Sequence, residues 1–316
     1  MTHEYWEAET QRALAEEAAE LGIEAFRRDE VIIVAGEVES EARRQAVEER
    51  ITRQFPSVRV LNEIVVARMT EPAEVPDGAL RVAAVGDVHM DQDVVGRYRP
   101  ALASLAERAD VLLLAGDLTR HGTPDEARCV ATEFGGLDVP VIAVLGNHDY
   151  HSDAEADVTA ILKEAGIEVL EGAGTVVSTG RGRIGVAGVK GFGGGFAGRC
   201  ATAFGEPETK AFVHTAERSA DSLAKALRAL DCDVRVALTH YAPVPDTLHG
   251  EPLEIYPFLG SHLLGEAIDA TGTDLAVHGH AHAGCERGTT PGGVRVRNVA
   301  HPVIRQAYSV FRVERQ

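Results

Sequence analysis

The sequence predicts an α/β protein in which a layered α/β domain follows a small α/β unit. Three observations support this fold class. After residue 79, short apolar runs rich in β-forming residues alternate with helical stretches, which is typical of a layered α/β domain. Later apolar runs come with few helical stretches, which indicates a second sheet packed on the first. Before residue 70, two helical and two β-rich segments alternate and form a compact unit.

The first 70 residues are predicted to form an α-β-α-β domain. Its elements are a helix over Trp6–Leu21, a strand over Val31–Val38, a helix over Ser40–Phe55 and a strand over Val58–Ala67. Ser40 is the predicted N-cap of the second helix, and Pro56 ends it. Residues 71–79 contain two prolines and a glycine, as linkers do, so we place the main domain at residues 80–316.

Within the main domain, apolar spacing separates helices from strands. The predicted helices are Pro100–Ala109, Asp125–Glu133, Glu155–Ala165 and Thr215–Leu230. Later strands are predicted over Arg183–Val189, Val294–Val299 and Ala307–Val313, and these suggest the second sheet.

Composition restricts the classes of partner. The chain has 316 residues, 45% hydrophobic and 25% charged, which is enough for one large or two unequal domains. The formal net charge is −18, and the first 80 residues carry 9 Arg, no Lys and 18 acidic residues. Broad binding to nucleic acid or to an anionic membrane needs clustered cations, so both are disfavoured, whereas a small, locally held anion is not.

Neither a membrane span nor a secretory signal is predicted, because no apolar run is long enough and the N-terminus carries early Glu. The four cysteines lie far apart, without the paired spacing of zinc ribbons or redox motifs. We therefore expect reduced, mostly structural cysteines and a cytoplasmic protein.

Polar side chains follow five predicted strands at the point where each strand ends. They are Asp87 and His89, Asp117, Asn147 and His148, His240, and His280 and His282. In α/β sheets, ligand sites form beyond the carboxyl ends of strands, where residues distant in sequence converge. A single Asp or His after a strand is usually a turn residue or a satisfied polar group. Repetition over five strands instead predicts one shared site.

These donors form a mixed oxygen and nitrogen set without sulfur. Such a set suits manganese, iron or zinc ions rather than thiolate-rich structural zinc or all-oxygen calcium. Seven ligands exceed the need of one ion, so we predict two divalent ions that share a bridging carboxylate. Two carboxylates against two such ions leave a local charge of about +2, which attracts phosphate.

The blocks Asp87-Val-His89, Gly116-Asp117, Gly146-Asn147-His148-Asp149, His240 and Gly279-His280-Ala281-His282 occur in this order over residues 87–282. This ordered set resembles the five motifs of the calcineurin-like metallophosphoesterase superfamily. The resemblance implies a four-layer α/β/β/α sandwich, here preceded by the small α+β domain.

The resemblance also implies a role for each residue. One ion would be held by Asp87, His89 and His282 and the other by Asn147, His240 and His280, with Asp117 bridging them. His148 resembles the family histidine that faces the scissile phosphate without binding metal, and its expected role is general acid. Asp149 either orients His148 or holds the loop, and we favour the second interpretation.

The function implied is metal-dependent hydrolysis of a phosphomonoester or phosphodiester by hydroxide that the two metals activate. The segment after Asp117 lacks the Asp-Arg-Gly of Ser/Thr protein phosphatases and is more similar to the small-molecule phosphodiesterase and phosphohydrolase branch. A small phosphorylated substrate is therefore expected. The alternative is a non-catalytic, metal- and ligand-binding regulatory protein or adaptor on the same fold.

Two further segments carry weaker patterns. The N-terminal domain loosely resembles a BON domain, through Val34-x-Gly36-x-Val38 and the block over 58–66. BON domains are associated with phospholipid contact, but the −9 charge of this region disfavours electrostatic binding to a phospholipid surface. A role in packing or self-association is the simpler interpretation. The glycine-rich residues 191–198 contain GxGxxG without a strand-turn-helix context, so we reject a dinucleotide site there. This segment either closes over the metals or is a connecting bend.

Two residues adjoin proposed ligands. Tyr241 follows His240 and is a candidate to line the pocket. His278 precedes Gly279-His280, and strand alternation predicts a supporting or core position for it.

Overall fold

The computed structural model describes residues 3–20, 22–28, 31–67, 69–70 and 79–314. Chain contacts divide it into two compact units, one of Met1–Met69 with Gln92–Val94 and one of Thr70–Asp91 with Val95–Gln316. All but the last residue of the predicted linker, 71–79, lies outside the described residues.

The first unit contains one three-stranded sheet and two helices. Its elements are α1 (His3–Ala18), β1 (Ile23–Arg28), β2 (Val31–Val38), α2 (Glu41–Gln54) and β3 (Arg59–Val66). Strand β2 lies centrally, antiparallel to β1 and parallel to β3. The Ser40 side chain accepts a hydrogen bond from the backbone N–H of Arg43, so the predicted N-cap of α2 is confirmed.

The predicted α-β-α-β order is wrong in one respect, because β1 adds a strand and the order is α-β-β-α-β. In β1 the buried Ile23 and Ala25 alternate with exposed Glu24 and Phe26. This half-buried strand contains charged residues and no continuous apolar run, so its signal in the sequence is weak. The core of the unit joins residues of α1, all three strands and α2, including Leu14, Ile32, Val47 and Ile51.

The second unit contains two mixed sheets. The first sheet has the order β16-β4-β5-β6-β7, with β4 (Leu80–Val85), β5 (Val111–Ala115), β6 (Val141–Val144), β7 (Ile167–Val169) and β16 (Ser309–Val313). The second has the order β14-β15-β13-β12-β9-β8, with β8 (Ala173–Thr179), β9 (Gly182–Val189), β12 (Val234–Thr239), β13 (Leu275–His278), β14 (Arg287–Thr289) and β15 (Arg295–Asn298). The two sheets pack on each other through β12 against β5 and β6.

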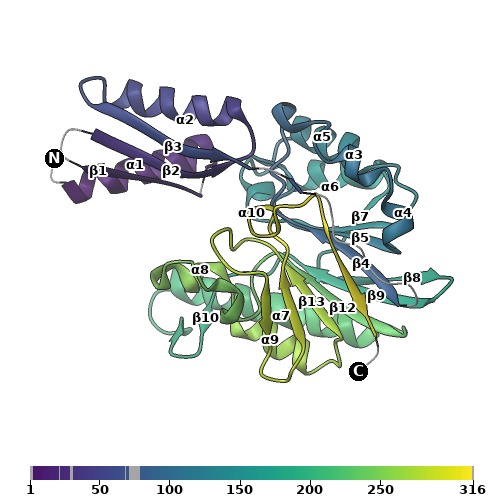
Figure 1. The fold of residues 1–316 in the computed structure, drawn as a ribbon. Helices are drawn as coiled ribbons and strands as arrows, with labels where there is room; N and C mark the ends of the chain where they lie inside the picture. The colour runs from purple at the N-terminus through teal and green to yellow at the C-terminus, as the bar shows by residue number, and fades with distance from the viewer. Residues whose placement is uncertain (1–2, 21, 29–30, 68, 71–78, 315–316) are drawn as a thin grey trace. The chain divides into compact units, whose positions relative to one another are not determined.

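Helices cover the outer faces of both sheets and complete an α/β/β/α sandwich (Figure 1). The α-helices of this unit are α3 (Arg99–Leu102), α4 (Leu105–Arg108), α5 (Pro124–Phe134), α6 (Glu155–Glu164), α7 (Pro207–Ala229), α8 (Tyr256–Leu259), α9 (His262–Asp269) and α10 (His301–Ile304), of which α8 packs on strands β10 (Gly195–Phe196) and β11 (Arg199–Cys200). Figure 1 shows α3, α5 and α6 beside the first sheet. Helices α7 and α9 share an apolar core with β9, β12 and β13.

Most predicted elements of this unit are confirmed, and three differ. The predicted helix over Pro100–Ala109 is two short helices, α3 and α4. Helix α7 begins at Pro207, eight residues earlier than predicted. The run Ala307–Val313 forms β16, which pairs with β4 in the first sheet and not with the second sheet. No helix among the described residues is long and apolar enough to cross a membrane.

The parallel strands β4, β5 and β6 lie side by side in one sheet, as do β12 and β13 in the other. These strands are almost entirely buried, so their backbones are fixed by packing on both faces. The loops at their carboxyl ends therefore start from rigid positions.

Replacement of a buried side chain of β5 tests this packing. Leu113 in β5 is fully buried, whereas Leu253 is 50% exposed. We expect Leu113→Ala to lower the free energy of unfolding by about 2–5 kcal/mol, through lost apolar burial and a cavity. Leu253→Ala is the control, with an expected change within about 0.5 kcal/mol. Chemical denaturation of both variants provides the comparison, and equal effects would contradict the assigned core.

Candidate metal centre

The structure places each predicted site residue directly beyond a buried strand. Asp87 and His89 follow β4, Asp117 follows β5, Asn147 and His148 follow β6, His240 follows β12, and His280 and His282 follow β13. The first three strands belong to one sheet and the last two to the other. Because the two sheets are packed together, loops from both sheets meet at this end.

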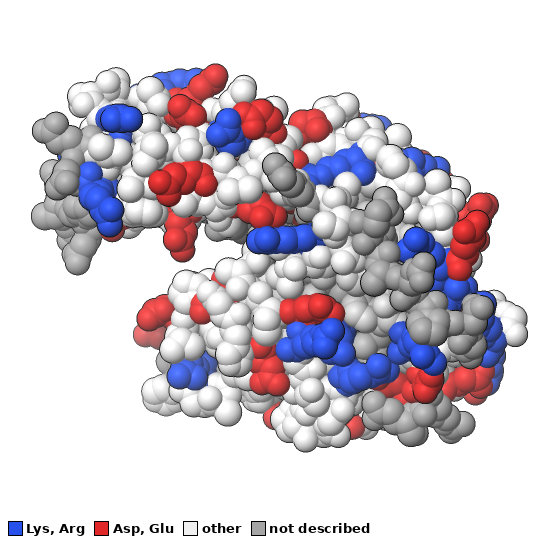
Figure 2. Space-filling model, in the orientation of Figure 1, with Lys and Arg blue, Asp and Glu red and all other residues white. Residues whose placement is uncertain are grey.

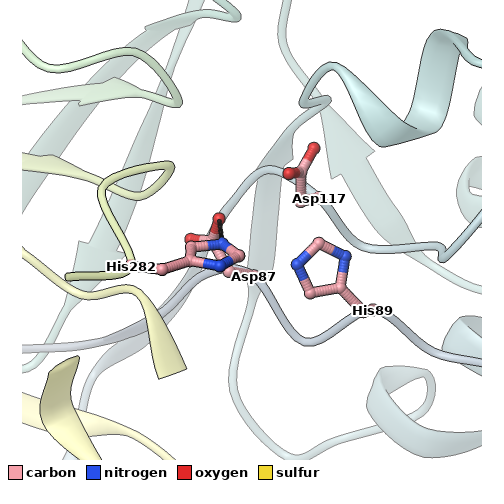
Figure 3. A group of neighbouring side chains, drawn as sticks. All are labelled: Asp87, His89, Asp117 and His282. Atoms are coloured by element: carbon pink, nitrogen blue, oxygen red, sulfur yellow. Dashed lines mark hydrogen bonds and ion pairs between the residues drawn. The ribbon is translucent and has the colours of Figure 1, made fainter. Parts of the chain in front are cut away.

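One group of possible metal ligands consists of Asp87, His89, Asp117 and His282. Their ligand atoms all lie within 4.8 Å of one another. Figure 3 shows these four side chains, from three loops, directed toward a common space. His282 Nε2 is 3.0 Å from Asp87 Oδ1.

A second group consists of Asp117, His240 and His280, whose ligand atoms also lie within 4.8 Å of one another. Asn147 adjoins it, since its Oδ1 is 2.9 Å from His240 Nε2. The same His240 nitrogen is 3.3 Å from Asp117 Oδ1. The carboxylate of Asp117 is therefore common to both groups.

The two aspartates are buried charges that need compensation. Asp87 is 0% exposed and Asp117 is 1% exposed. Burial alone raises the pKa of Asp117, but the positive charges of His240 and His148 outweigh it and hold the pKa well below its usual value. Burial lowers the pKa of His282, but its hydrogen bond to Asp87 overcomes this and raises the pKa to about 9.

The backbone is strained at these positions. Asp87, His89, Asp117 and His280 have φ angles of 55°, 42°, 49° and 71°, in the left-handed region that residues with a Cβ rarely adopt. Such strain costs about 1–3 kcal/mol per residue and clusters at functional sites. Four of the seven predicted ligands share this conformation, which indicates that the surrounding structure forces their side chains into place.

Two glycines allow the carboxylates to approach the neighbouring loops. A Cβ atom at Gly146 would lie 2.1 Å from Asp117 Oδ1, and one at Gly279 would lie 2.2 Å from Asp87 Oδ2. Neither position therefore accommodates a side chain without displacing a carboxylate.

His148 lies beside the two groups and belongs to neither. Its Nδ1 is 2.8 Å from the Arg120 carbonyl oxygen, and its backbone N–H donates to Asp117 Oδ1. Its Nε2 is buried, has no hydrogen-bond partner among the described residues, and is 3.9 Å from Asp117 Oδ2. The Arg120 contact was absent from the sequence prediction, because a backbone carbonyl has no sequence signal.

Asp149 holds the loops together. It is fully buried and accepts hydrogen bonds from the backbone N–H groups of Leu118, Thr119 and Gly146. Burial and the nearby Asp117 charge raise its pKa. These contacts agree with the loop-holding interpretation.

A third group, Asp91, His121 and Glu126, was not predicted. Glu126 completes a capping box with Thr123 at the start of α5, a signal that the sequence Thr-Pro-Asp-Glu contained. Its Oε2 accepts the backbone N–H groups of His121 and Thr123, and its Oε1 is 2.8 Å from His121 Nδ1. Both Glu126 oxygens are thus already engaged, and the group orders the loop after β5.

The two residues that adjoin ligands differ in role. The Tyr241 ring centroid is 4.4 Å from that of His280, so Tyr241 contacts the second ligand group. His278 is buried, with Nε2 2.8 Å from Thr247 Oγ1, and burial lowers its pKa to about 4. His278 is therefore a core histidine behind the site.

The glycine-rich segment packs against α8. Gly194 and Gly195 donate backbone hydrogen bonds to the carbonyls of Pro257 and Gly260, and β10 (Gly195–Phe196) pairs with β11 (Arg199–Cys200). This arrangement is not the strand-turn-helix of a dinucleotide site, in agreement with the sequence analysis.

The donor set fits divalent metal ions. Two buried carboxylates face five nitrogen or amide donors, and Gly146 and Gly279 have no side chain that would displace them. The adjacent His148 Nε2 is buried and has no hydrogen-bond partner in the part of the chain that the structure describes. Ligands of this kind suit manganese, iron and zinc.

Comparison with known families gives the class of protein. The model of the calcineurin-like phosphoesterase family matches residues 80–284, which include every predicted ligand. The chain therefore belongs to the calcineurin-like phosphoesterase family. The match leaves out the first unit, so the BON resemblance stays a prediction.

One solved structure, with a TM-score above 0.5, supports the fold. Phosphopantetheinyl hydrolase from Mycobacterium tuberculosis is 16% identical with a TM-score of 0.55, over 74% of this chain and 96% of that one. A proposed 5′-nucleotidase from Staphylococcus aureus is 15% identical with a TM-score of 0.46, over 74% of this chain and 53% of that one. A search of curated proteins found no match.

Gly146→Ala tests the close approach of Asp117. The new methyl group would displace the carboxylate, so we expect the affinity for Mn²⁺ to fall about tenfold or more. The matched control is Gly180→Ala, since a Cβ at Gly180 meets no atom within 4 Å. Titration of metal-depleted protein with Mn²⁺ measures both variants, and equal affinities would argue against a metal role for Asp117.

Proposed function

We propose that this protein hydrolyses a small phosphomonoester or phosphodiester at a centre of two divalent metal ions. The observation that carries the proposal is the buried Asp117 carboxylate, which is common to two groups of possible ligands. Family membership supports metal-dependent phosphoester hydrolysis in general. The geometry supports the finer assignment of residues.

In this proposal each group of side chains holds one ion. Asp87, His89 and His282 would hold the first ion, Asn147, His240 and His280 would hold the second, and Asp117 would be a ligand of both. Two bound ions would supply positive charge that polarises the phosphoryl group and lowers the pKa of a bound water. The protein keeps these ligands in place through strained loops and through hydrogen bonds such as His240 Nδ1 to the Ala115 carbonyl, at 2.9 Å.

His148 is the proposed general acid. Its Nδ1 proton is donated to the Arg120 carbonyl, so Nε2 is the nitrogen that can give a proton to the leaving oxygen. Nε2 is also the ring nitrogen on the side of Asp117. Asp149 positions this histidine indirectly, because it ties Gly146 to Leu118 and Thr119.

The rival function is recognition without turnover, in which the same residues hold metals and a ligand in a regulatory protein or adaptor. The placement of a buried histidine nitrogen beside the ligand groups favours the enzyme, because a binding protein does not need a proton donor there. A protein that binds metal and phosphate but hydrolyses no ester would support the rival.

Removal of the shared ligand tests the metal centre. We expect Asp117→Ala to lose metal binding and at least about 10³-fold in hydrolysis, because both groups lose their common carboxylate. The assay compares aryl phosphomonoesters with linear and cyclic diesters in the presence of manganese, zinc and iron ions in turn. Asp125→Ala, at an exposed position at the start of α5, is the control and keeps full activity. Unchanged activity of Asp117→Ala would refute the proposed centre.

Removal of the acid should leave the metals in place. For His148→Ala we expect a fall in kcat of about 10²–10⁴-fold on substrates with poor leaving groups, and a smaller fall with p-nitrophenolate, which leaves without a proton. Metal content measured by mass spectrometry should match the wild type. His151→Ala, at an exposed histidine three residues on, is the control. An equal loss on both leaving groups would exclude the acid role.

A further inference from the structure

Lys190 lies at the end of another strand beside the metal centre. It is not among the site residues predicted from the sequence. It follows β9, which pairs in parallel with β12, the strand that ends at His240. The Lys190 carbonyl accepts the backbone N–H groups of His240 and Tyr241, at 2.9 and 3.1 Å. Its backbone is therefore fixed to the loop that carries a proposed ligand.

Three aromatic rings surround the Lys190 ammonium. Nζ lies 4.9 Å from the ring centroid of Tyr150 and 5.2 Å from those of Phe192 and Tyr241. Two of these rings are built into the metal loops, since Tyr150 comes two residues after His148 and Tyr241 directly after His240. Aromatic faces attract a cation through their π electrons and carry no net negative charge that would neutralise it.

Some N–H donors of the Lys190 ammonium have no partner among the described residues. The Lys190 ammonium forms no ion pair with any carboxylate in the described part of the chain, and the one hydrogen bond of Nζ there is a long contact of 3.5 Å to the Gly191 carbonyl. Glu171, the nearby carboxylate, accepts from the Lys190 backbone N–H at 3.0 Å and not from Nζ. An ammonium carries three N–H donors, so at least two have no partner among these residues.

A partly buried ammonium without an anionic partner lowers the stability of the fold, and a bound anion would offset this loss. The side chain is half-buried, and burial lowers the pKa of Lys190 while the negative charges of Glu171 and Asp117 oppose the fall. The ring of Tyr241 is in contact with Lys190 on one side and with the His280 ring, 4.4 Å away, on the other. The cation is therefore one aromatic ring away from the second ligand group.

We propose that Lys190 is a specificity-determining residue that binds a non-bridging oxygen of the substrate phosphate and favours dianionic monoesters over monoanionic diesters. The proposal rests on the proposed function, because it assumes that phosphate enters this centre. A fixed cation stabilises a dianion more than a monoanion at the same distance. The aromatic rings hold the ammonium in place before substrate binds, which reduces the entropy lost on binding.

Substitution of the charge alone tests the proposal. Lys190→Met keeps an unbranched side chain that packs against the three rings, and Lys190→Arg keeps the charge. Lys163→Met, at an exposed lysine of α6, is the matched control. Hydrolysis of p-nitrophenyl phosphate and of bis(p-nitrophenyl) phosphate is measured for all three variants and for the wild type, with metal content checked in each.

For Lys190→Met we expect kcat/KM on the monoester to fall about 10–100-fold, mainly through KM, while kcat/KM on the diester falls less than about threefold. Lys190→Arg should recover part of the loss, and Lys163→Met should match the wild type. Equal losses on both esters, or no loss on either, would overturn the proposal, because a packing role does not distinguish the charge of the substrate.

A second measurement separates this proposal from the proposed function. Binding of inorganic phosphate to the Mn²⁺-loaded protein is followed by calorimetry, which requires no turnover. We expect Lys190→Met to weaken phosphate binding about tenfold or more at unchanged metal content. If no ester is hydrolysed but this loss is seen, the proposed function fails and the anion-binding role of Lys190 stands. If esters are hydrolysed and phosphate binds Lys190→Met as tightly as the wild type, the Lys190 proposal alone fails.

Discussion

The interaction on which the rest of the site depends is the buried contact of Asp117 with His240. Asp117 follows β5 in the first sheet and His240 follows β12 in the second, so their contact at 3.3 Å joins the two sheets at the end where the loops of the site meet. A buried carboxylate is unfavourable unless positive charge surrounds it. His240 therefore stabilises Asp117, and its own Nδ1 is held by the Ala115 carbonyl at the end of β5. The same contact therefore joins the two sheets and compensates the buried charge of Asp117.

The need to hold Asp117 and the other donors close together explains why the backbone strain lies in the loops after the buried strands. Left-handed backbone at Asp87, His89 and Asp117, together with the close approach at Gly146, lowers stability locally. Each of these loops follows a strand that is fully buried, and the core around β4, β5 and β6 contributes the free energy that offsets the strain. The rigid strands thus keep the loops in their strained conformation. Without these strands the loops would relax and the donors would separate.

Sequence patterns predicted the parts of the molecule that local signals encode. Polar residues that follow buried strands, most of them next to a glycine, marked eight side chains that the structure brings together beyond the strand ends, and Ser40 marked the start of α2. Parts set by tertiary contacts were missed or misplaced: β1 is only half-buried, and β16 pairs with β4 across more than two hundred residues. The Arg120 carbonyl at His148 and the rings around Lys190 are also tertiary, because no spacing rule links Tyr150, Phe192 and Tyr241.

The charge distribution of the chain means that cations close to the site determine how strongly a phosphate ester is attracted to it. The chain carries a formal charge of −18, and on the face in Figure 2 acidic side chains lie among and beside the basic ones. This net negative charge opposes long-range steering of a phosphate ester to the protein. Attraction has to arise within a few ångströms of the centre, from bound metal ions and from a cation that forms no ion pair with a carboxylate among the described residues. Lys190 meets the second condition because aromatic rings, which stabilise an ammonium without cancelling its charge, take the place of an acidic partner.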